Sequence, residues 1–433
     1  MQSQSIVIVG GGFAGTTLAG ALDGNLPAGC ELVLVSEESY TTFHPMLPEA
    51  LGASVFPEQV VAPIRAMLAR ARFIMGRVTA LDPVRRTLAC TTVAGDITLP
   101  YTQLVLAFGN RARLDLLPGL AKHALPLKTV GDAVHIRNVV LRRLARIELE
   151  DDACARRRLG RFIVLGGGFS GVECAGELAD CLRGIRRYYP RVREDELSIT
   201  LLHDLPRLLP ELPQALGAAA RRSLTERGVD VRTGVRAARV CAAGVWLADG
   251  AFVAGATVVC TIGTQPNALA ARASLPLERG RIVVDADLAV RGTPGVWAIG
   301  DCAYARNAHD ASIAPPTAQF AVAQARTLAR NLLATLAGRP TRPFAHRSRG
   351  AMAALGHRRG VANVLGIPLT GFAAWLVWRA YYLSRMPTLG RKLRIFVEWT
   401  WGMFFPSDIT HLRFTRSVEI ETSGSEQKAG FLL

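Results

Sequence analysis

The chain has 433 residues, of which 50% are hydrophobic and 20% are charged, with 41 glycines and 23 prolines. This composition excludes a collagen-like, low-complexity or largely disordered protein, and the length predicts two or three packed units. The formal net charge of +16 indicates an anionic partner, such as nucleic acid, a membrane surface or an anionic substrate. Because only four of the 51 basic residues are lysines, a general preference for arginine also explains this charge.

The N-terminal segment contains no basic residue before Arg65. Secretory and transit peptides need basic residues around an apolar stretch, so the sequence predicts no such leader and a cytoplasmic N-terminus. Residues 5–9 (SIVIV) instead form a predicted strand that runs directly into GGGFAG at residues 10–15, and a helical pattern follows.

The same pattern of strand, glycines and helix returns 156 residues later, with RFIVL at 161–165 and GGGFSG at 166–171. In this fingerprint the first glycine permits a tight turn, the second lets backbone amides approach a pyrophosphate, and the third lets the helix pack on the strand. The glycines in these roles are Gly10, Gly12 and Gly15 in the first copy and Gly166, Gly168 and Gly171 in the second. Two copies predict two Rossmann-like dinucleotide sites in an α/β protein.

An acidic residue at the end of the second strand of such a unit commonly binds the adenosine ribose. The strand predicted over residues 32–35 leads to Glu37, which is therefore the ribose ligand expected in the first unit. The strand predicted over residues 198–202 ends at His203, with Arg207 nearby. Because a histidine there tolerates a 2′-phosphate better than an acid does, the choice of nicotinamide nucleotide stays open, with NADH favoured and NADPH as the alternative donor.

Three further apolar segments complete a flavoprotein pattern. Residues 103–109 and 256–263 are predicted strands that end in glycine, as expected where the chain crosses between two nucleotide units. The strand predicted over residues 296–299 delivers Asp301, which by itself is explained as a turn or cap residue. Together with two fingerprints, Asp301 is predicted to accept hydrogen bonds from the ribityl hydroxyls of a flavin.

The eight cysteines have no CxxC spacing and no arrangement typical of a zinc site or a disulfide framework. We expect reduced structural thiols and no metal. The spacing also excludes the paired redox-active dithiol that some flavoprotein reductases use.

The C-terminal segment over residues 340–433 carries 13 basic and 5 acidic residues, so half of the net charge lies there. Residues 361–378 are uncharged and reach the lower length limit of a spanning helix. Because Gly366, Pro368 and Gly371 interrupt them, we predict a strand and turn followed by a helix over about 372–382.

The segment over residues 391–405 has apolar residues at helical spacing, a basic start and many aromatics, which is typical of a helix in the lipid headgroup layer. A helix packed on the core or on a second copy of the chain is the alternative. Residues 423–433 are predicted to be a disordered end. No motif beyond basicity indicates nucleic-acid binding, and none is expected.

Taken together, these residues resemble the type II, non-electrogenic NADH:quinone oxidoreductases, which are flavoprotein reductases with two dinucleotide-binding domains. The resemblance extends over nearly the whole chain. Its motifs are GGGFAG at 10–15, YTTFHPMLPEA at 40–50, FG at 108–109, GGGFSGVECAGEL at 166–178, PRLLP at 206–210, TIG at 261–263, GDC at 300–302 and PPTAQ at 315–319 with Gln324. The last of these resembles the quinone-site signature of the family.

The resemblance implies an FAD domain over residues 1–120 and 285–335, an NAD(P)H domain over 121–284 and a membrane-anchoring region with amphipathic helices over 336–433. It implies two-electron transfer from NADH through the flavin to a membrane quinone without ion pumping. It also implies a peripheral protein on the cytoplasmic face of the inner cell membrane, and a homodimer is compatible with this arrangement.

By position, the resemblance assigns roles to individual residues. The FAD ligands that it implies are Gly10, Gly12, Phe13, Ala14, Gly15, Glu37, Pro45, Gly109 and Asp301. The residues that it places toward NADH are Gly166, Gly168, Gly171 and Glu173, and those toward the quinone are Gln319 and Gln324. Otherwise Glu173 is a first-turn acid that stabilises a helix dipole, and the two glutamines are ordinary polar residues on a helix.

Two other functions stay open from the residues. A sulfide:quinone oxidoreductase needs cysteines that converge at the flavin, for which only Cys174 and Cys302 are placed, and Glu173 argues against it. A flavin-bearing redox sensor at the membrane is a non-enzymatic alternative, and the pair Gln319 and Gln324 argues against that.

Overall fold

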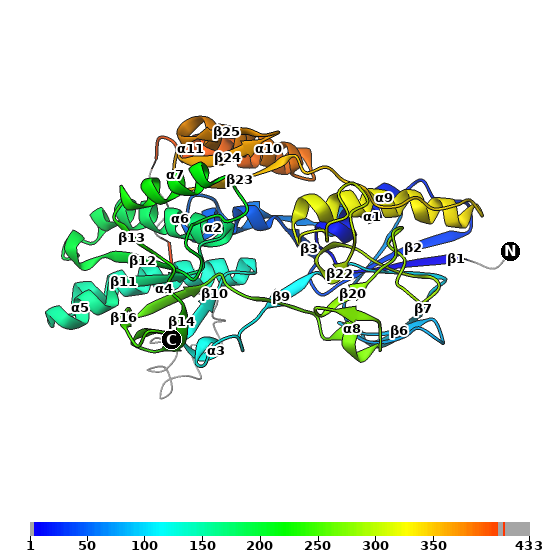
Figure 1. Cartoon of the computed structure of the whole chain (residues 1–433), viewed down its shortest axis with the longest axis horizontal. Helices are drawn as coiled ribbons and strands as arrows, with labels where there is room; N and C mark the ends of the chain where they lie inside the picture. The colour runs from blue at the N-terminus through cyan, green and yellow to red at the C-terminus, as the bar shows by residue number, and fades with distance from the viewer. Residues whose placement is uncertain (1–3, 406–409, 412–433) are drawn as a thin grey trace.

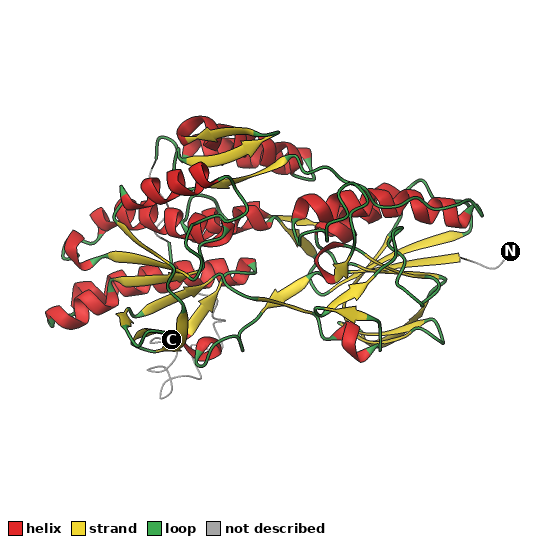
Figure 2. Cartoon of the chain, in the orientation of Figure 1, coloured by secondary structure: helices red, strands yellow, loops and turns green. Residues whose placement is uncertain are grey.

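The computed structural model describes residues 4–405 and 410–411, so the segment 423–433 predicted to be disordered lies outside the described residues. Two α/β units lie side by side, and a small layer made by a C-terminal sheet and two helices lies over the second unit (Figure 1, Figure 2). The predicted α/β class with two Rossmann-type sheets is confirmed, whereas the domain boundaries stay a prediction.

The first unit is built on a seven-stranded sheet in the order β21-β8-β1-β2-β5-β6-β7. Its parallel strands are β1 (Gln4–Val9), β2 (Cys30–Ser36), β8 (Gln103–Leu106) and β21 (Val296–Ala298). The strands β5 (Arg72–Asp82), β6 (Thr87–Thr92) and β7 (Gly95–Pro100) extend it, with antiparallel pairing from β5 to β7. The helices α1 (Phe13–Leu22) and α9 (Ala318–Leu336) pack together on one face (Figure 1).

The predicted strands of the first unit are confirmed, because each apolar run forms a strand buried inside the parallel sheet. Two of them end earlier than the apolar run does. Gly109 has φ +63° and Gly300 has φ +74°, so left-handed backbone turns the chain away from the sheet at these positions.

The second unit has a five-stranded parallel sheet in the order β10-β17-β11-β12-β13. Its strands are β10 (Ala124–Pro126), β11 (Arg161–Leu165), β12 (Ser198–His203), β13 (Val229–Thr233) and β17 (Thr257–Cys260). The helices are α4 (Val130–Leu149), α5 (Ala153–Leu159), α6 (Phe169–Ile185) and α7 (Gln214–Thr225). A small antiparallel sheet of β14 (Ala237–Cys241), β15 (Gly244–Leu247) and β16 (Phe252–Ala254) lies beside it.

Two antiparallel strands connect the units, and each directly follows one of the two glycine-ended apolar segments. The chain leaves the first unit through β9 (Asn110–Ala112) and returns through β18 (Thr264–Pro266) (Figure 1). The remaining short elements are β3 (Tyr40–Thr42), α2 (Leu47–Leu51), β4 (Val61–Pro63), α3 (Leu120–His123), α8 (Leu269–Arg272), β19 (Leu277–Glu278), β20 (Arg281–Val283) and β22 (Ala303–Tyr304).

Each unit has its own apolar core, and one N-terminal segment belongs to both units. Helix α2 precedes the second unit by more than 70 residues in the sequence, yet Leu47 and Leu51 pack into the core of that unit against α4 and α6. This segment therefore ties the two units together beside the space that separates them.

The C-terminal region forms a three-stranded antiparallel sheet and two helices. Its elements are β23 (Gly350–Ala354), β24 (Gly360–Val364), β25 (Ile367–Thr370), α10 (Gly371–Arg385) and α11 (Leu389–Trp401). The predicted strand, turn and helix are confirmed, and Gly366 and Gly371 make the turns with φ of +92° and +65°. Among the described residues, no helix is both long and apolar enough to cross a membrane.

Candidate active site

The two glycine fingerprints have matching backbone geometry. Gly10 and Gly166 have φ of +117° and +113°, a left-handed region that glycine adopts easily. A Cβ at Gly15 would collide with the carbonyl oxygen of Gly10, and a Cβ at Gly171 would collide with that of Gly166. Each third glycine therefore lets its helix press against the preceding turn.

The middle glycines of the fingerprints, Gly12 and Gly168, face open space. They are the N-caps of α1 and α6, and no side chain caps either helix within the described residues. A Cβ at either position would meet no described atom within 4 Å. The backbone amides at these helix starts therefore lie beside a space that fits an anionic pyrophosphate.

The residues that follow Gly12 line the same region. Phe13 packs edge-on against Phe43, with ring centroids 5.3 Å apart, and lies 6.2 Å from the ring of His44. Ala14 is buried, and its Cβ lies near Gly300, where a Cβ would come within 3.1 Å of it. The first fingerprint thus joins the chain segment before Asp301.

The residues that end the second strands occupy equivalent places. A Cβ at Gly11 would meet the Ser36 side chain, and a Cβ at Gly167 would meet the His203 ring. The Gly167 N–H donates to His203 Nδ1 at 3.1 Å, and desolvation lowers the pKa of His203, so this imidazole is neutral at physiological pH. The second unit therefore has an uncharged ring where an acid would repel a 2′-phosphate.

Glu37 lies directly after β2 and is paired with two arginines. Its carboxylate is 2.9 Å from Arg111 and 3.3 Å from Arg77, and the side chain is partly exposed. The structure places Glu37 at the predicted strand end, while its contact with a ribose stays a prediction.

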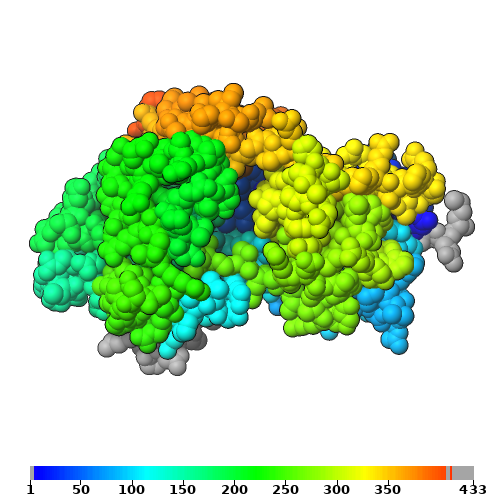
Figure 3. Space-filling view, in the orientation of Figure 1, coloured from blue at the N-terminus to red at the C-terminus, as the bar shows by residue number. Residues whose placement is uncertain are grey.

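A hollow separates the two units, and blue N-terminal residues are visible at its floor (Figure 3). The carboxyl ends of β1 and β8 lie on this side of the sheet. Because β1 has β8 on one side and β2 on the other, the strand order reverses at β1. Ligands of open α/β sheets bind at such a topological switch point. Half-buried Pro45 lies in the 3-10 turn His44–Met46, and Gly109 also faces open space. Asp301 accepts a hydrogen bond from Asn110 Nδ2 at 3.0 Å.

Glu173 projects from α6 toward the C-terminal sheet. Its Oε1 accepts a hydrogen bond from the Ala354 N–H at 3.1 Å, and the residue is 6% exposed. Burial, followed by the nearby carboxyls of Glu49 and Glu177, raises the pKa of Glu173 well above its usual value. The first turn of α6, all of which is described, contains no acid, so the helix-dipole explanation for Glu173 is not supported.

The ionisable residues Glu49, Glu177 and Arg379 form a largely buried group beside Glu173 that the sequence analysis missed. Arg379 lies 3.7 Å from Glu49, and the Trp399 indole donates to the same carboxyl at 3.1 Å. Glu177 accepts a hydrogen bond from Ser54 Oγ at 2.6 Å, and burial raises its pKa to about 8. The four-residue spacing from Glu173 to Glu177 was the available signal, whereas Glu49 reaches the group only through tertiary packing.

The two glutamines of the quinone-site signature are engaged in hydrogen bonds inside the chain. Gln319 Oε1 accepts from the Arg349 N–H at 3.0 Å, and its Nε2 donates to the Gly350 carbonyl at 3.2 Å. Gln324 is 1% exposed, and its Oε1 accepts from the Gly300 N–H at 2.6 Å. Gln319 therefore braces the chain at the start of β23, and Gln324 braces the turn before Asp301, while contact with a quinone stays a prediction.

The two cysteines that a sulfide-oxidising site would need are buried thiols. Burial raises the pKa of Cys302 to about 12 and that of Cys174 further, so both are protonated at neutral pH. Among the described residues, no group of three or more His, Cys, Asp and Glu side chains could hold a metal ion.

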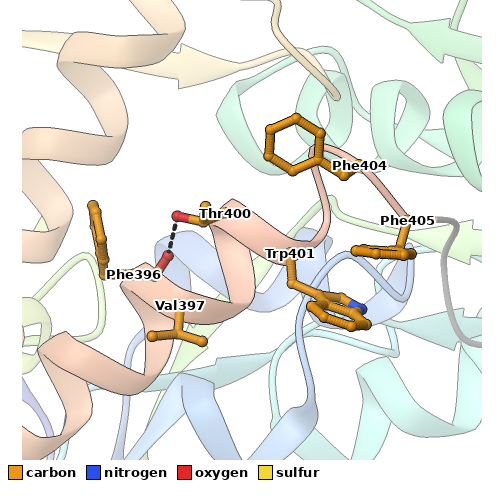
Figure 4. Close-up of a pocket in the computed structure, with 6 residues that line it drawn as sticks. All are labelled: Phe396, Val397, Thr400, Trp401, Phe404 and Phe405. Carbon is orange, nitrogen blue, oxygen red and sulfur yellow. Dashed lines mark hydrogen bonds between the residues drawn. The ribbon is translucent and has the colours of Figure 1, made fainter.

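Helix α11 has one face on the core and one face exposed. Ile395 and Trp399 are buried, so the predicted alternative of packing on the core holds for this face. The opposite face carries large exposed apolar side chains, and Trp401 stacks on Phe405 with ring centroids 3.9 Å apart. Residues that line an apolar pocket there are Phe396, Val397, Thr400, Trp401, Phe404 and Phe405 (Figure 4).

Comparison with known proteins extends over nearly all of the chain. Residues 4–325 match the family model described as pyridine nucleotide-disulphide oxidoreductase. The demethylphylloquinone reductase NdbB of Synechocystis is 32% identical over 408 residues, covering 91% of this chain and 95% of that protein. The type II NADH:quinone oxidoreductase Ndh of Mycobacterium tuberculosis is 27% identical over 425 residues, covering 92% and 88%.

Solved structures share the whole fold. The structure of NDH2 from Plasmodium falciparum in complex with NADH has a TM-score of 0.88 at 18% identity, with 94% of this chain and 100% of that chain covered. The sulfide:quinone oxidoreductase from Aquifex aeolicus has a TM-score of 0.68 at 17% identity, with 95% and 100% covered. At these identities the likeness shows the fold alone.

Proposed function

Because the chain belongs to the pyridine nucleotide-disulphide oxidoreductases, and among them to the type II NADH:quinone oxidoreductase family, we propose that it transfers two electrons from NADH to a membrane quinone. The observation that carries this proposal is the matched geometry of the two glycine fingerprints, which we call the first cradle (residues 10–15) and the second cradle (residues 166–171). Each has open space before a helix start. When bound, FAD supplies the chemistry by accepting a hydride from NADH and passing on the electrons.

The first cradle would hold FAD through backbone amides, because Gly12 leaves room for its pyrophosphate. Gly109 faces open space, and the next residue, Asn110, donates to Asp301, which supports the proposed roles of Gly109 and Asp301, with Pro45, as further FAD ligands. The second cradle would bind NADH through Gly166, Gly168 and Gly171.

Glu173 would hold the proton that the reaction consumes. The overall reaction converts NADH, one proton and a quinone into NAD+ and a quinol, so a single proton must be delivered from the protein or from water. The burial of Glu173, which raises the pKa of its carboxyl, supports this role, and the hydrogen bond from the Ala354 N–H fixes the direction of the side chain. Gln319 and Gln324 would border the quinone site through the segments that they brace.

The C-terminal region over residues 336–433 would attach the protein to the membrane surface without crossing it. Leu393, Phe396 and Trp401 are 63%, 56% and 61% exposed along one side of α11. Lys392 and the exposed Arg394 lie near the start of the helix, where they can meet anionic headgroups. This charge favours a lipid surface over a second copy as the occupant of this face, and the proposed location is the cytoplasmic face of the inner membrane.

The function is tested with the purified full chain and three electron donors. We expect a flavin absorbance that NADH bleaches under anaerobic conditions and that a short-chain quinone then restores. NADPH should act more weakly, and sulfide should not bleach the flavin. Folded protein that contains no flavin and takes none up would refute the proposal.

Membrane attachment is tested separately with Phe396→Asp and Trp401→Asp. We expect both variants to leave vesicles of anionic phospholipid while they still reduce a soluble dye with NADH. Val84→Asp is the matched control, because Val84 is 93% exposed on the remote β5–β6 turn. Full vesicle binding by both α11 variants would contradict attachment through this helix.

A further inference from the structure

Lys128 is an unusual residue in a chain that uses arginine almost throughout. Only four of the 51 basic residues are lysines, and three of them are Lys122, Lys392 and Lys428. Lys128 is half-buried between β10 and the N-cap of α4, so it is held by the second unit. A lysine ammonium is a compact positive charge with three hydrogen-bond donors.

The side chain of Lys128 reaches across to the first unit through Asn110. Lys128 Nζ donates to Asn110 Oδ1 at 2.6 Å, and Asn110 Nδ2 donates to Asp301 Oδ2 at 3.0 Å. The three residues come from the second unit, from the connecting strand β9 and from the first unit. They converge beside Gly109, where a Cβ would meet no described atom within 4 Å.

Lys128 lies among three other titratable groups, which are Asp301, His44 and Arg281. Burial lowers the pKa of Lys128, and Asp301 opposes this shift, so the ammonium and carboxylate support each other. Desolvation, followed by the charge of Lys128, lowers the pKa of His44. Arg281 also faces Asp301, but its guanidinium donates to the Ala314 carbonyl at 3.1 Å.

We propose that Lys128 is a further cofactor residue, whose ammonium, oriented by Asn110 and Asp301, faces the flavin and stabilises the negative charge that the flavin gains on reduction. The inference rests on the proposed function, since it requires FAD beside Asp301. A positive charge near a redox group favours the reduced form because the opposite charges attract. The purely structural alternative is that Lys128 only neutralises Asp301.

The test measures the flavin midpoint potential by anaerobic titration against reference dyes, together with the ratio of flavin to protein. The variants are Lys128→Met, which removes the charge, and Lys128→Arg, which keeps it. Lys122→Met is the matched control, because Lys122 is exposed and six residues earlier in the chain. We expect Lys128→Met to lower the equilibrium constant for reduction about tenfold, a potential about 30 mV more negative. Lys122→Met should leave the potential unchanged.

Each outcome decides the role of the charge. Flavin bound by Lys128→Met with an unchanged potential would overturn the proposal and leave Lys128 as the partner of Asp301. If Lys128→Met folds but binds no flavin, binding of flavin by Lys128→Arg supports the proposed role of the positive charge. If both variants fold and neither binds flavin, the proposal is overturned. Failure of the proposed function looks different, because the unsubstituted protein would then lack flavin or fail to reduce a quinone.

Discussion

The two glycine fingerprints have the same backbone conformation but are packed against different elements. In each, the first glycine has a left-handed backbone, the second faces open space, and the third lets the helix contact the turn. Position for position, Thr17 of α1 corresponds to Glu173 of α6. The backbone cradle was therefore kept in both units, while the side chain five residues into the helix differs.

The difference follows from what covers each helix. Helix α1 packs against α9 within the first unit. Helix α6 contacts α2 and β23, and a Cβ at Gly176 would collide with the Leu355 carbonyl. The second cradle thus lies where three parts of the chain meet, so its helix can present carboxyls to a buried interface. The comparison indicates that the two units share one backbone geometry at their helix starts and differ in the side chains that the covering elements bury.

The largest expected effect is on nucleotide binding by the variants Gly12→Val and Gly168→Val, which each block one of the two cradles. Both positions have extended backbone and open space, so valine should fold in place but occupy the volume that a pyrophosphate needs. We expect Gly12→Val to lose its flavin. Gly168→Val should keep the flavin and raise the KM for NADH by about 100-fold, or about 2.7 kcal/mol. Loss of flavin from both variants would show that the cradles do not bind separate nucleotides.

The next effect concerns the carboxyls that only α6 carries. Burial raises the pKa of Glu177 from 4.5 to about 8, so the folded protein binds a proton that the unfolded chain releases. The stability that this proton provides is complete below pH 4.5 and is lost as the pH rises through about 8. Between pH 6 and pH 9 the unfolding free energy should therefore fall by on the order of 2 kcal/mol, and by less in Glu177→Gln.

Chemical denaturation at several pH values measures this difference. Glu194→Gln is the control, because the Glu194 side chain is 82% exposed in its pair with Arg186. An identical pH dependence in Glu177→Gln and the unsubstituted protein would mean that Glu177 stays ionised in the folded state.

The smallest effect concerns the strand ends, where Ser36 and His203 lie against equivalent glycines. His203→Glu places a negative charge where a 2′-phosphate would bind, so we expect the ratio of kcat/KM for NADPH to that for NADH to fall about tenfold, or about 1.4 kcal/mol. Ser36→Glu makes the same change in the other unit and should leave this ratio unaltered. A change of the ratio by Ser36→Glu alone would reverse the assignment of the two nucleotides.

Short sequence patterns, such as apolar runs and glycine spacings, were enough to predict most strands and helix starts of the fold. The apolar runs at 5–9 and 161–165 became β1 and β11, and Gly10, Gly12 and Gly15 took the conformations that their spacing predicts. These features depend on neighbours within a few residues, because a tight turn and a helix start are set by local backbone sterics and hydrogen bonds. The amphipathic pattern of α11 was also legible, since its exposed and buried faces follow helical spacing.

Tertiary structure alone decided which distant charges meet. Glu49 lies more than 120 residues before Glu173 and more than 320 before Arg379, and no spacing in the sequence relates them. Likewise, Lys128, Asn110 and Asp301 converge only because two strands carry the chain across between the units. The physical reason is that burial of the apolar side chains on the same elements, and not the polar side chains themselves, brings these polar residues together. The packing of α2 and α10 fixes where their polar side chains end.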